Sequence, residues 1–116
     1  MQKLEVFGAN KLKGKIKISG SKNAALPILA STLLSYKKIS LKNIPKVKDI
    51  ETMIKLLQSL GSKIRFNKKT LFIDNSNQNK KFASYNLVKT MRAGILVLGP
   101  LLAKFGTAKV SLPGGC

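Results

Sequence analysis

The chain has 116 residues and carries 22 lysine or arginine residues against four aspartate or glutamate residues, so its formal net charge is +18 at pH 7. A balance this basic indicates nucleic acid or an anionic surface as a partner. However, twenty of the cations are lysines and no run is longer than two, so the arginine forks that grip phosphates and read bases are scarce. The length allows one domain or a part of one. Because there is no histidine, zinc sites, Ser-His-Asp triads and histidine general bases are excluded within this chain.

Three features bear on cellular location. The N-terminal residues have no long apolar core of a signal peptide. The most apolar later stretch, residues 93–105, is interrupted by Gly99-Pro100 and is too short to cross a bilayer. A single cysteine cannot form an internal disulfide, which suits a reducing compartment. We therefore expect a cytoplasmic protein that does not bind a membrane.

The first part of the chain alternates between strand and helix patterns. Leu4–Phe7 and Gly14–Ser19 show the period-two alternation of apolar residues that is typical of strands. Ala24–Leu34 is apolar on nearly every side, which predicts a buried helix with Pro27 in its first turn. Tyr36–Ile44 alternates again and predicts a further strand.

A second helix and a hairpin follow. Asp49 is predicted to cap a helix that ends at Gly61, because the apolar residues between them recur at spacings of three and four. Lys63–Phe66 and Thr70–Asp74 then predict two strands of a hairpin. Asn75–Lys81 is polar and is expected to be a surface loop.

The last part of the chain predicts one long helix and one strand. Apolar residues recur at three and four from Asn86 to Phe105, so we expect a helix that is kinked or broken at Gly99-Pro100. Ala108–Leu112 predicts the final strand. The order from Gly14 is therefore β-α-β-α-β-β, followed by a helix and a strand, which indicates the α/β (α+β) class.

Glycine turns follow two of the predicted strands and place candidate residues at their ends. Lys22 and Asn23 stand at the start of the first helix, where backbone N–H groups and the helix dipole favour an anion and a lysine adds to the attraction. On this pattern alone, a capped helix start with a solvated lysine is the better interpretation. Cys116 follows the last strand in the same way, so a repeated unit has only begun and we expect the chain to continue.

Three motifs, taken together and in this order, favour a functional site over a solvated lysine. They are Ser19–Pro27 (Ser-Gly-Ser-Lys-Asn-Ala-Ala-Leu-Pro), Leu87–Ala93, which contains Arg92, and Val110–Cys116 with its Pro-Gly-Gly-Cys loop. Together they resemble the UDP-N-acetylglucosamine 1-carboxyvinyltransferase family, and the resemblance covers the whole chain. The related shikimate-pathway enolpyruvyl transferase does not share the Pro-Gly-Gly-Cys loop.

The resemblance implies an enzyme that transfers enolpyruvyl from phosphoenolpyruvate to the 3′-hydroxyl of UDP-N-acetylglucosamine and releases phosphate. This reaction is the first committed step of peptidoglycan synthesis, on which cell wall formation, cell shape and cell division depend. Lys22 and Arg92 would bind phosphoenolpyruvate, and Asn23 would contact the sugar nucleotide or the intermediate. Cys116 would be the catalytic thiol, which fosfomycin alkylates in this family. The resemblance implies no metal and no organic cofactor.

The resemblance also implies an inverse α/β barrel built from β-α-β-α-β-β repeats, of which only the first repeat and the start of the second are present. Residues 1–21 would be strands of the second, C-terminal domain. Residues 22–116 would be the first part of the catalytic domain, truncated at the active-site loop. Because the carboxylate general base of the family lies much further along its chain, we expect these residues alone to be inactive.

Two other interpretations remain at this point. The chain could be a non-catalytic fragment kept only as a folded piece. It could also be a small basic nucleic-acid-binding domain, whose affinity would fall steeply with salt.

Overall fold

The computed structural model describes residues 2–8, 11–83 and 85–112. Helices and strands succeed one another from residue 22 onward. They are α1 (Lys22–Ser31), the 3₁₀ turn η1 (Thr32–Leu34), β1 (Lys38–Leu41), α2 (Lys48–Ser59), β2 (Lys63–Asn67), β3 (Thr70–Asp74), β4 (Phe82–Ala83), α3 (Tyr85–Val88), the 3₁₀ segment η2 (Arg92–Val97), α4 (Leu98–Phe105) and β5 (Lys109–Val110).

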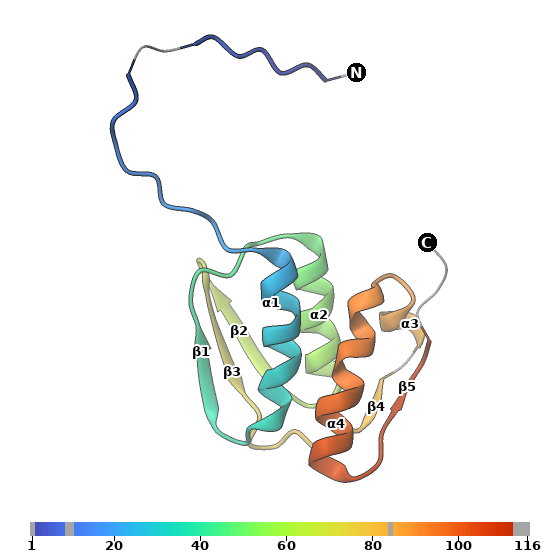
Figure 1. Cartoon of the computed structure of the whole chain (residues 1–116). Coiled ribbons are helices and arrows are strands. Elements are labelled where there is room, and N and C mark those ends of the chain that lie inside the picture. Colours follow the sequence, from blue (N-terminus) through green and yellow to red (C-terminus); the bar gives the residue numbers. More distant parts are fainter. Residues whose placement is uncertain (1, 9–10, 84, 113–116) are drawn as a thin grey trace.

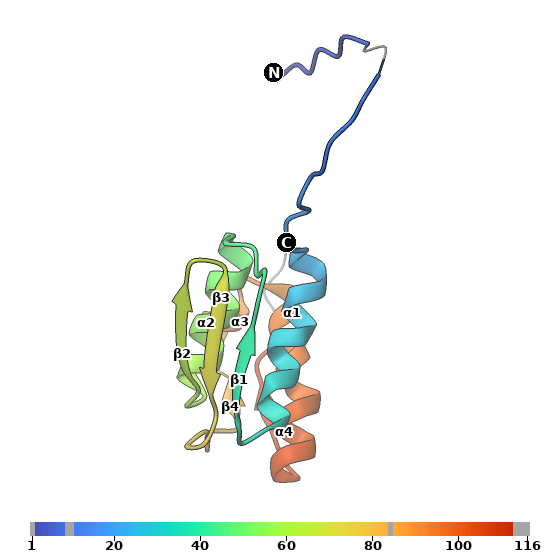
Figure 2. The same ribbon diagram turned by 90° about the vertical axis from the view of Figure 1, so that its left-hand side faces the viewer.

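The strands β1, β3 and β2 form an antiparallel sheet in that order. Ile73 of β3 lies opposite Ile39 of β1 and Ile64 of β2, so apolar side chains of all three strands share one face. Helices α1 and α2 cover that face, and α4 extends the helical layer beyond the sheet, as Figures 1 and 2 show from two sides. The fold is therefore a helical layer packed on a small sheet.

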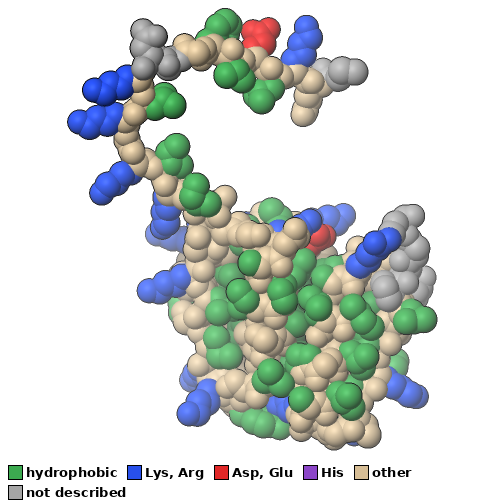
Figure 3. Space-filling model, viewed as in Figure 1, with side chains coloured by type: hydrophobic (Ala, Val, Ile, Leu, Met, Phe, Trp, Pro, Cys, Tyr) green, Lys and Arg blue, Asp and Glu red, His purple; other side chains and the backbone are tan. Residues whose placement is uncertain are grey.

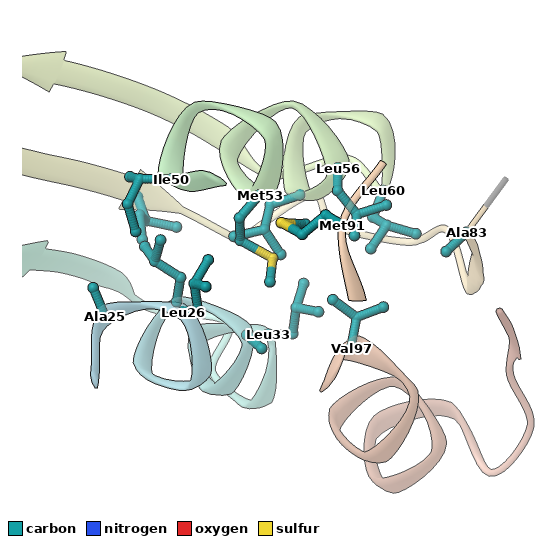
Figure 4. Packing of buried hydrophobic residues seen from close by; sticks show 14 of the residues in the cluster. Ala25, Leu26, Leu33, Ile50, Met53, Leu56, Leu60, Ala83, Met91 and Val97 are labelled. Atoms are coloured by element: carbon teal, nitrogen blue, oxygen red, sulfur yellow. The ribbon is translucent and has the colours of Figure 1, made fainter. Parts of the chain in front are cut away.

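The core lies between the sheet and the helices. Helix α2 turns its apolar stripe inward because its buried residues recur at three and four. In Figure 4, Leu26 and Leu33 on one side point toward Ile50 and Met53 on the other. The larger side chains with less than 2% exposure are Leu29, Leu33, Ile50, Met53, Leu56, Leu57, Leu60, Leu71, Ile73, Leu101, Val88 and Val97.

The predicted second helix and hairpin are confirmed, with a change at one cap. Helix α2 ends beside Gly61, which has a φ of 107°, and the hairpin turns through Lys68 and Lys69 between Asn67 and Thr70. The prediction that Asp49 caps the helix is wrong. The N-cap is Val47, which makes no side-chain capping bond, and Asp49 lies one residue inside the helix.

The predicted helix from Ala24 begins two residues earlier, at Lys22. Ser21 is its N-cap and accepts a hydrogen bond from the Ala24 N–H at 3.4 Å. Pro27 therefore lies in the second turn and not in the first. Because proline has no N–H, the Asn23 carbonyl lacks its usual helical hydrogen-bond donor. The last predicted residues form the 3₁₀ turn η1 instead of α-helix.

The predicted long helix breaks at a different place from the one expected. Met91 has extended backbone angles of −150° and 113°, and this separates α3 from η2. The break lets Gly94 pack against Val88, where an added Cβ would lie 3.2 Å from a Val88 methyl. Pro100 falls in the first turn of α4, where a missing N–H costs little, so no break is needed there.

Two features of the C-terminal half were not expected. The short strand β4 pairs in parallel with β5, so Phe82 lies opposite Lys109, and the segment from α3 to α4 makes the crossover. The predicted surface loop at residues 75–81 contains two buried side chains, Asn75 and Gln78. The burial of these two side chains corrects the prediction of a surface loop, which rested on polarity alone.

The N-terminal segment, residues 2–8 and 11–20, contains no strand. It runs away from the rest of the chain (Figure 1), and Figure 3 shows its apolar and basic side chains facing solvent. Leu12 is 89% exposed and Ile16 87% exposed. The two strands predicted here are therefore not formed, because alternation specifies a face while a strand also requires a neighbour for its backbone groups.

Candidate active site

The start of α1 supplies two of the candidate residues. Because Ser21 caps the helix, Lys22 and Asn23 are its first two residues, and both side chains are exposed. The N-terminus of a helix carries partial positive charge, to which the Lys22 ammonium adds a full charge. This turn is therefore suited to an anion.

A close backbone approach fixes the position of that turn. An added Cβ on Gly20 would lie 1.9 Å from the Asn43 carbonyl oxygen and 3.0 Å from Cδ of Pro45. Asn43 itself has a left-handed φ of 59°, and the next N–H, of Ile44, donates to the Lys69 carbonyl at 3.0 Å. Glycine at position 20 thus allows the loop before α2 to touch the chain just before α1.

The two helix N-termini consequently lie side by side, and an ion pair joins them. The Lys22 Nζ is 2.9 Å from Asp49 Oδ2, with the two side chains 46% and 40% exposed. Both residues lie in the first turn of their helices, and the two helices pack along their length (Figure 1). A carboxylate is favoured at this point because it faces the positive end of the α2 dipole.

Arg92 is exposed at the first position of η2, the segment that packs against α1. Its neighbour Met91 is buried and holds the start of η2 in the core. The structure thus places the elements that carry Lys22, Asn23 and Arg92 next to one another. Cys116 and the rest of the Pro-Gly-Gly-Cys loop lie outside the described residues.

A second polar cluster lies at the opposite ends of the same helices. The Asn75 side-chain amide donates to the Thr32 carbonyl at 2.6 Å, and the Gln78 amide donates to the carbonyls of Leu60 and Lys80 at 3.1 and 2.7 Å. The Lys104 ammonium donates to Gln78 Oε1 at 2.7 Å and lies 3.9 Å from the centre of the Tyr36 ring.

Partial burial lowers the pKa of Lys104. The Asn75 and Gln78 amides satisfy the Thr32 and Leu60 carbonyls at the helix C-termini, so their role is to stabilise the fold.

Metal binding and membrane crossing find no support in the described part of the chain. Across residues 2–8, 11–83 and 85–112, no three acidic, histidine or cysteine side chains gather as metal ligands would. Within the same residues no helix has both the length and the apolar character needed to span a bilayer.

Asp49 is the site residue that sequence reasoning missed. It lies 27 positions from Lys22, so no local pattern connects the two. The signal that could have pointed to Asp49 is its charge. It is one of four acidic residues beside 22 cations, and it follows Pro45 at the start of a predicted helix.

The family of the chain follows from its comparison with known proteins. The sequence model of the EPSP synthase (3-phosphoshikimate 1-carboxyvinyltransferase) family matches residues 6–116. The chain belongs to this family. Within the EPSP synthase family, it is 78% identical over all its residues to the UDP-N-acetylglucosamine 1-carboxyvinyltransferase of Pelagibacter ubique. Proteins of the same name from Acinetobacter guillouiae and Yersinia pestis are 53% and 55% identical over the same length.

The chain spans 28% of the length of each of these relatives. A solved structure of the enolpyruvyl transferase NikO from Streptomyces tendae superposes with a TM-score of 0.72, over 87% of this chain and 24% of that one. At 19% identity this likeness concerns the fold alone. The mixed helix and strand content that the sequence predicted is confirmed. The fold is that of a part of an enolpyruvyl transferase.

Proposed function

We propose that the chain is the N-terminal part of a UDP-N-acetylglucosamine 1-carboxyvinyltransferase. This enzyme would move the enolpyruvyl group of phosphoenolpyruvate to the 3′-hydroxyl of UDP-N-acetylglucosamine, with release of phosphate. The observation that carries the proposal is the 78% identity, across the whole chain, to the Pelagibacter protein of that name. The adjoining N-termini of α1 and α2 with Lys22 between them support it, because they suit an anionic substrate.

Phosphoenolpyruvate carries a phosphate and a carboxylate, so a lysine point charge and an arginine fork form a suitable pair to hold it. In this proposal Lys22 and Arg92 bind those two groups. Asn23, next to Lys22 on the same exposed turn, contacts the sugar nucleotide or the intermediate. Cys116 is the catalytic thiol. The residues need no metal or organic cofactor for these roles.

The N-terminal segment has a separate role in the proposal. Residues 1–21 belong to the second domain of the complete enzyme, and residues 22–116 to the first. The exposed apolar side chains of the segment support this division, because Leu4, Leu12 and Ile16 are each more than 85% exposed and the rest of this chain does not cover them. In this proposal the protein acts in the cytoplasm, takes part in peptidoglycan synthesis and is a target of fosfomycin.

A chimera tests the activity. Residues 1–116 replace the matching segment of the Pelagibacter relative, and phosphate release is measured with phosphoenolpyruvate and UDP-N-acetylglucosamine. We expect turnover that requires both substrates, and none from the 116-residue chain alone. A folded chimera without turnover would overturn the proposal.

Fosfomycin labelling tests the thiol. Intact mass spectrometry of the chimera should show one covalent adduct, and Cys116→Ala should abolish both adduct and turnover. The turnover assay also tests whether nucleic acid is a partner. If the substrates are small anions, excess duplex DNA should not inhibit turnover at physiological salt. An adduct that persists in Cys116→Ala would exclude Cys116 from the role.

A further inference from the structure

Asp49 stands out among the acidic residues of this basic chain. There are four, Glu5, Asp49, Glu51 and Asp74, beside 22 cations. Of these four carboxylates, all within the described ranges, Asp49 is the one that forms an ion pair, and its partner is the lysine at the start of α1. Asp49 and Glu51 both lie in the first turn of α2, yet only Asp49 is joined to Lys22.

The backbone directs the Asp49 carboxylate toward Lys22. The loop before α2 is held on one side by the contact between Gly20 and Asn43, and on the other by the hydrogen bond from the Ile44 N–H to the Lys69 carbonyl. Asp49 does not cap its own helix, because Val47 occupies the N-cap. Its carboxylate is therefore available to the neighbouring helix.

We infer that Asp49 is a positioning residue that holds the Lys22 ammonium over the two helix N-termini. This inference rests on the proposed function, in which Lys22 binds phosphoenolpyruvate. A lysine ammonium ends a flexible four-carbon stem and is not oriented by its own geometry. The carboxylate supplies that orientation, and its negative charge also moderates the attraction of the site for any anion.

The two effects of Asp49 predict an unusual kinetic result. Removing the negative charge strengthens the attraction for phosphoenolpyruvate in the ground state, so KM falls. The ammonium is then less well placed in the transition state, so kcat falls as well. Unfolding of part of the sample would lower kcat without lowering KM, which separates positioning from structural damage.

The experiment uses the chimera described above with three single-site variants at Asp49 and Glu51. Asp49→Asn should lower kcat about fivefold, the size expected for a half-exposed ion pair, with a lower KM for phosphoenolpyruvate. Asp49→Glu keeps the carboxylate and should recover at least about half of kcat. Glu51→Gln is the matched control, because it removes the same charge from the same turn, and it should leave both constants unchanged.

A double-mutant cycle decides whether Asp49 acts through Lys22. Lys22→Ala should lower kcat about a hundredfold, as for loss of a charged group at a reacting anion. Adding Asp49→Asn to it should cause no further loss. Additive losses, equal effects at Asp49 and Glu51, or a higher KM in Asp49→Asn would overturn the inference. If Lys22→Ala itself leaves turnover unchanged, the role of Lys22 in the proposed function fails instead.

Discussion

The two ends of helices α1 and α2 are built differently. At their C-terminal ends, the buried side-chain amides of Asn75 and Gln78 donate hydrogen bonds to the carbonyls of Thr32 and Leu60. At their N-terminal ends the polar groups are exposed, and an ion pair between Lys22 and Asp49 joins the two helices. The same pair of helices thus carries a stabilising end and an end open to a ligand.

The difference follows from what each end of a helix requires. Buried carbonyls at a C-terminus must find donors inside the protein, since an unpaired buried polar group costs stability. An exposed N-terminus can bond water until an anion replaces the water. Substitutions of the polar side chains at the C-terminal ends should therefore change stability, and substitutions of the polar side chains at the N-terminal ends should change binding and turnover.

Gln78→Ala should give the largest loss of stability. It removes the donor to Leu60 and Lys80 and the acceptor of Lys104, so we expect a loss of about 3 kcal/mol in the free energy of unfolding. Urea unfolding of the 116-residue chain, followed by circular dichroism, measures it. Asn77→Ala, at an exposed neighbouring position, should change stability by less than about 0.5 kcal/mol. Equal effects of the two variants would show that the buried amide does not stabilise this end.

Gly20→Ala should lower stability by a smaller amount. The new Cβ would meet the Asn43 carbonyl, so the loop before α2 must move, at a cost of about 2 kcal/mol. The same shift should separate Asp49 from Lys22 and reduce turnover of the chimera. Gly99→Ala is the control, because an added Cβ at Gly99 meets no atom within 4 Å. If Gly20→Ala unfolds at the same urea concentration as Gly99→Ala, the close approach does not constrain the loop.

Lys22→Ala should have little effect on stability, in contrast to its effect on turnover. A half-exposed ion pair contributes less than about 1 kcal/mol, and the change also relieves repulsion in a chain with a net charge of +18. Urea unfolding of the variant should therefore overlay that of the parent chain. A large shift would mean that the ion pair between Lys22 and Asp49 also stabilises the fold.

The smallest expected effect is a pH dependence from Lys104. Burial lowers the pKa of Lys104 from 10.5, so the unfolded chain binds more protons than the folded chain between the two pKa values. Stability from this group should rise as the pH approaches 10.5 from below. Lys104→Met should flatten that rise in urea midpoints measured between pH 8 and 10.5. An unchanged slope would assign the rise to other groups.

Local signals predicted the helix α2 and the hairpin because their apolar spacing, the glycine at the end of the helix and the short turn all lie within a few residues. The break at Met91 escaped prediction because the apolar periodicity continues through it, whereas the packing of Gly94 on Val88 decides the backbone. The motifs predicted that Lys22, Asn23 and Arg92 belong to one site, and in the structure the elements that carry them pack against each other. The ion pair to Asp49 could not be foreseen, since it depends on how two helices pack.

The exposed N-terminal segment has a consequence for the synthesis of the protein. Since the chain is 28% of the length of its relatives, about 300 further residues would follow it in the complete enzyme that we propose, and a ribosome adds about 5–20 residues per second. The segment would then emerge first and wait for tens of seconds before its partner strands exist. An unpaired, alternating apolar strand invites aggregation. The lysines at alternate positions, Lys11, Lys13, Lys15 and Lys17, would keep neighbouring nascent chains apart during that interval.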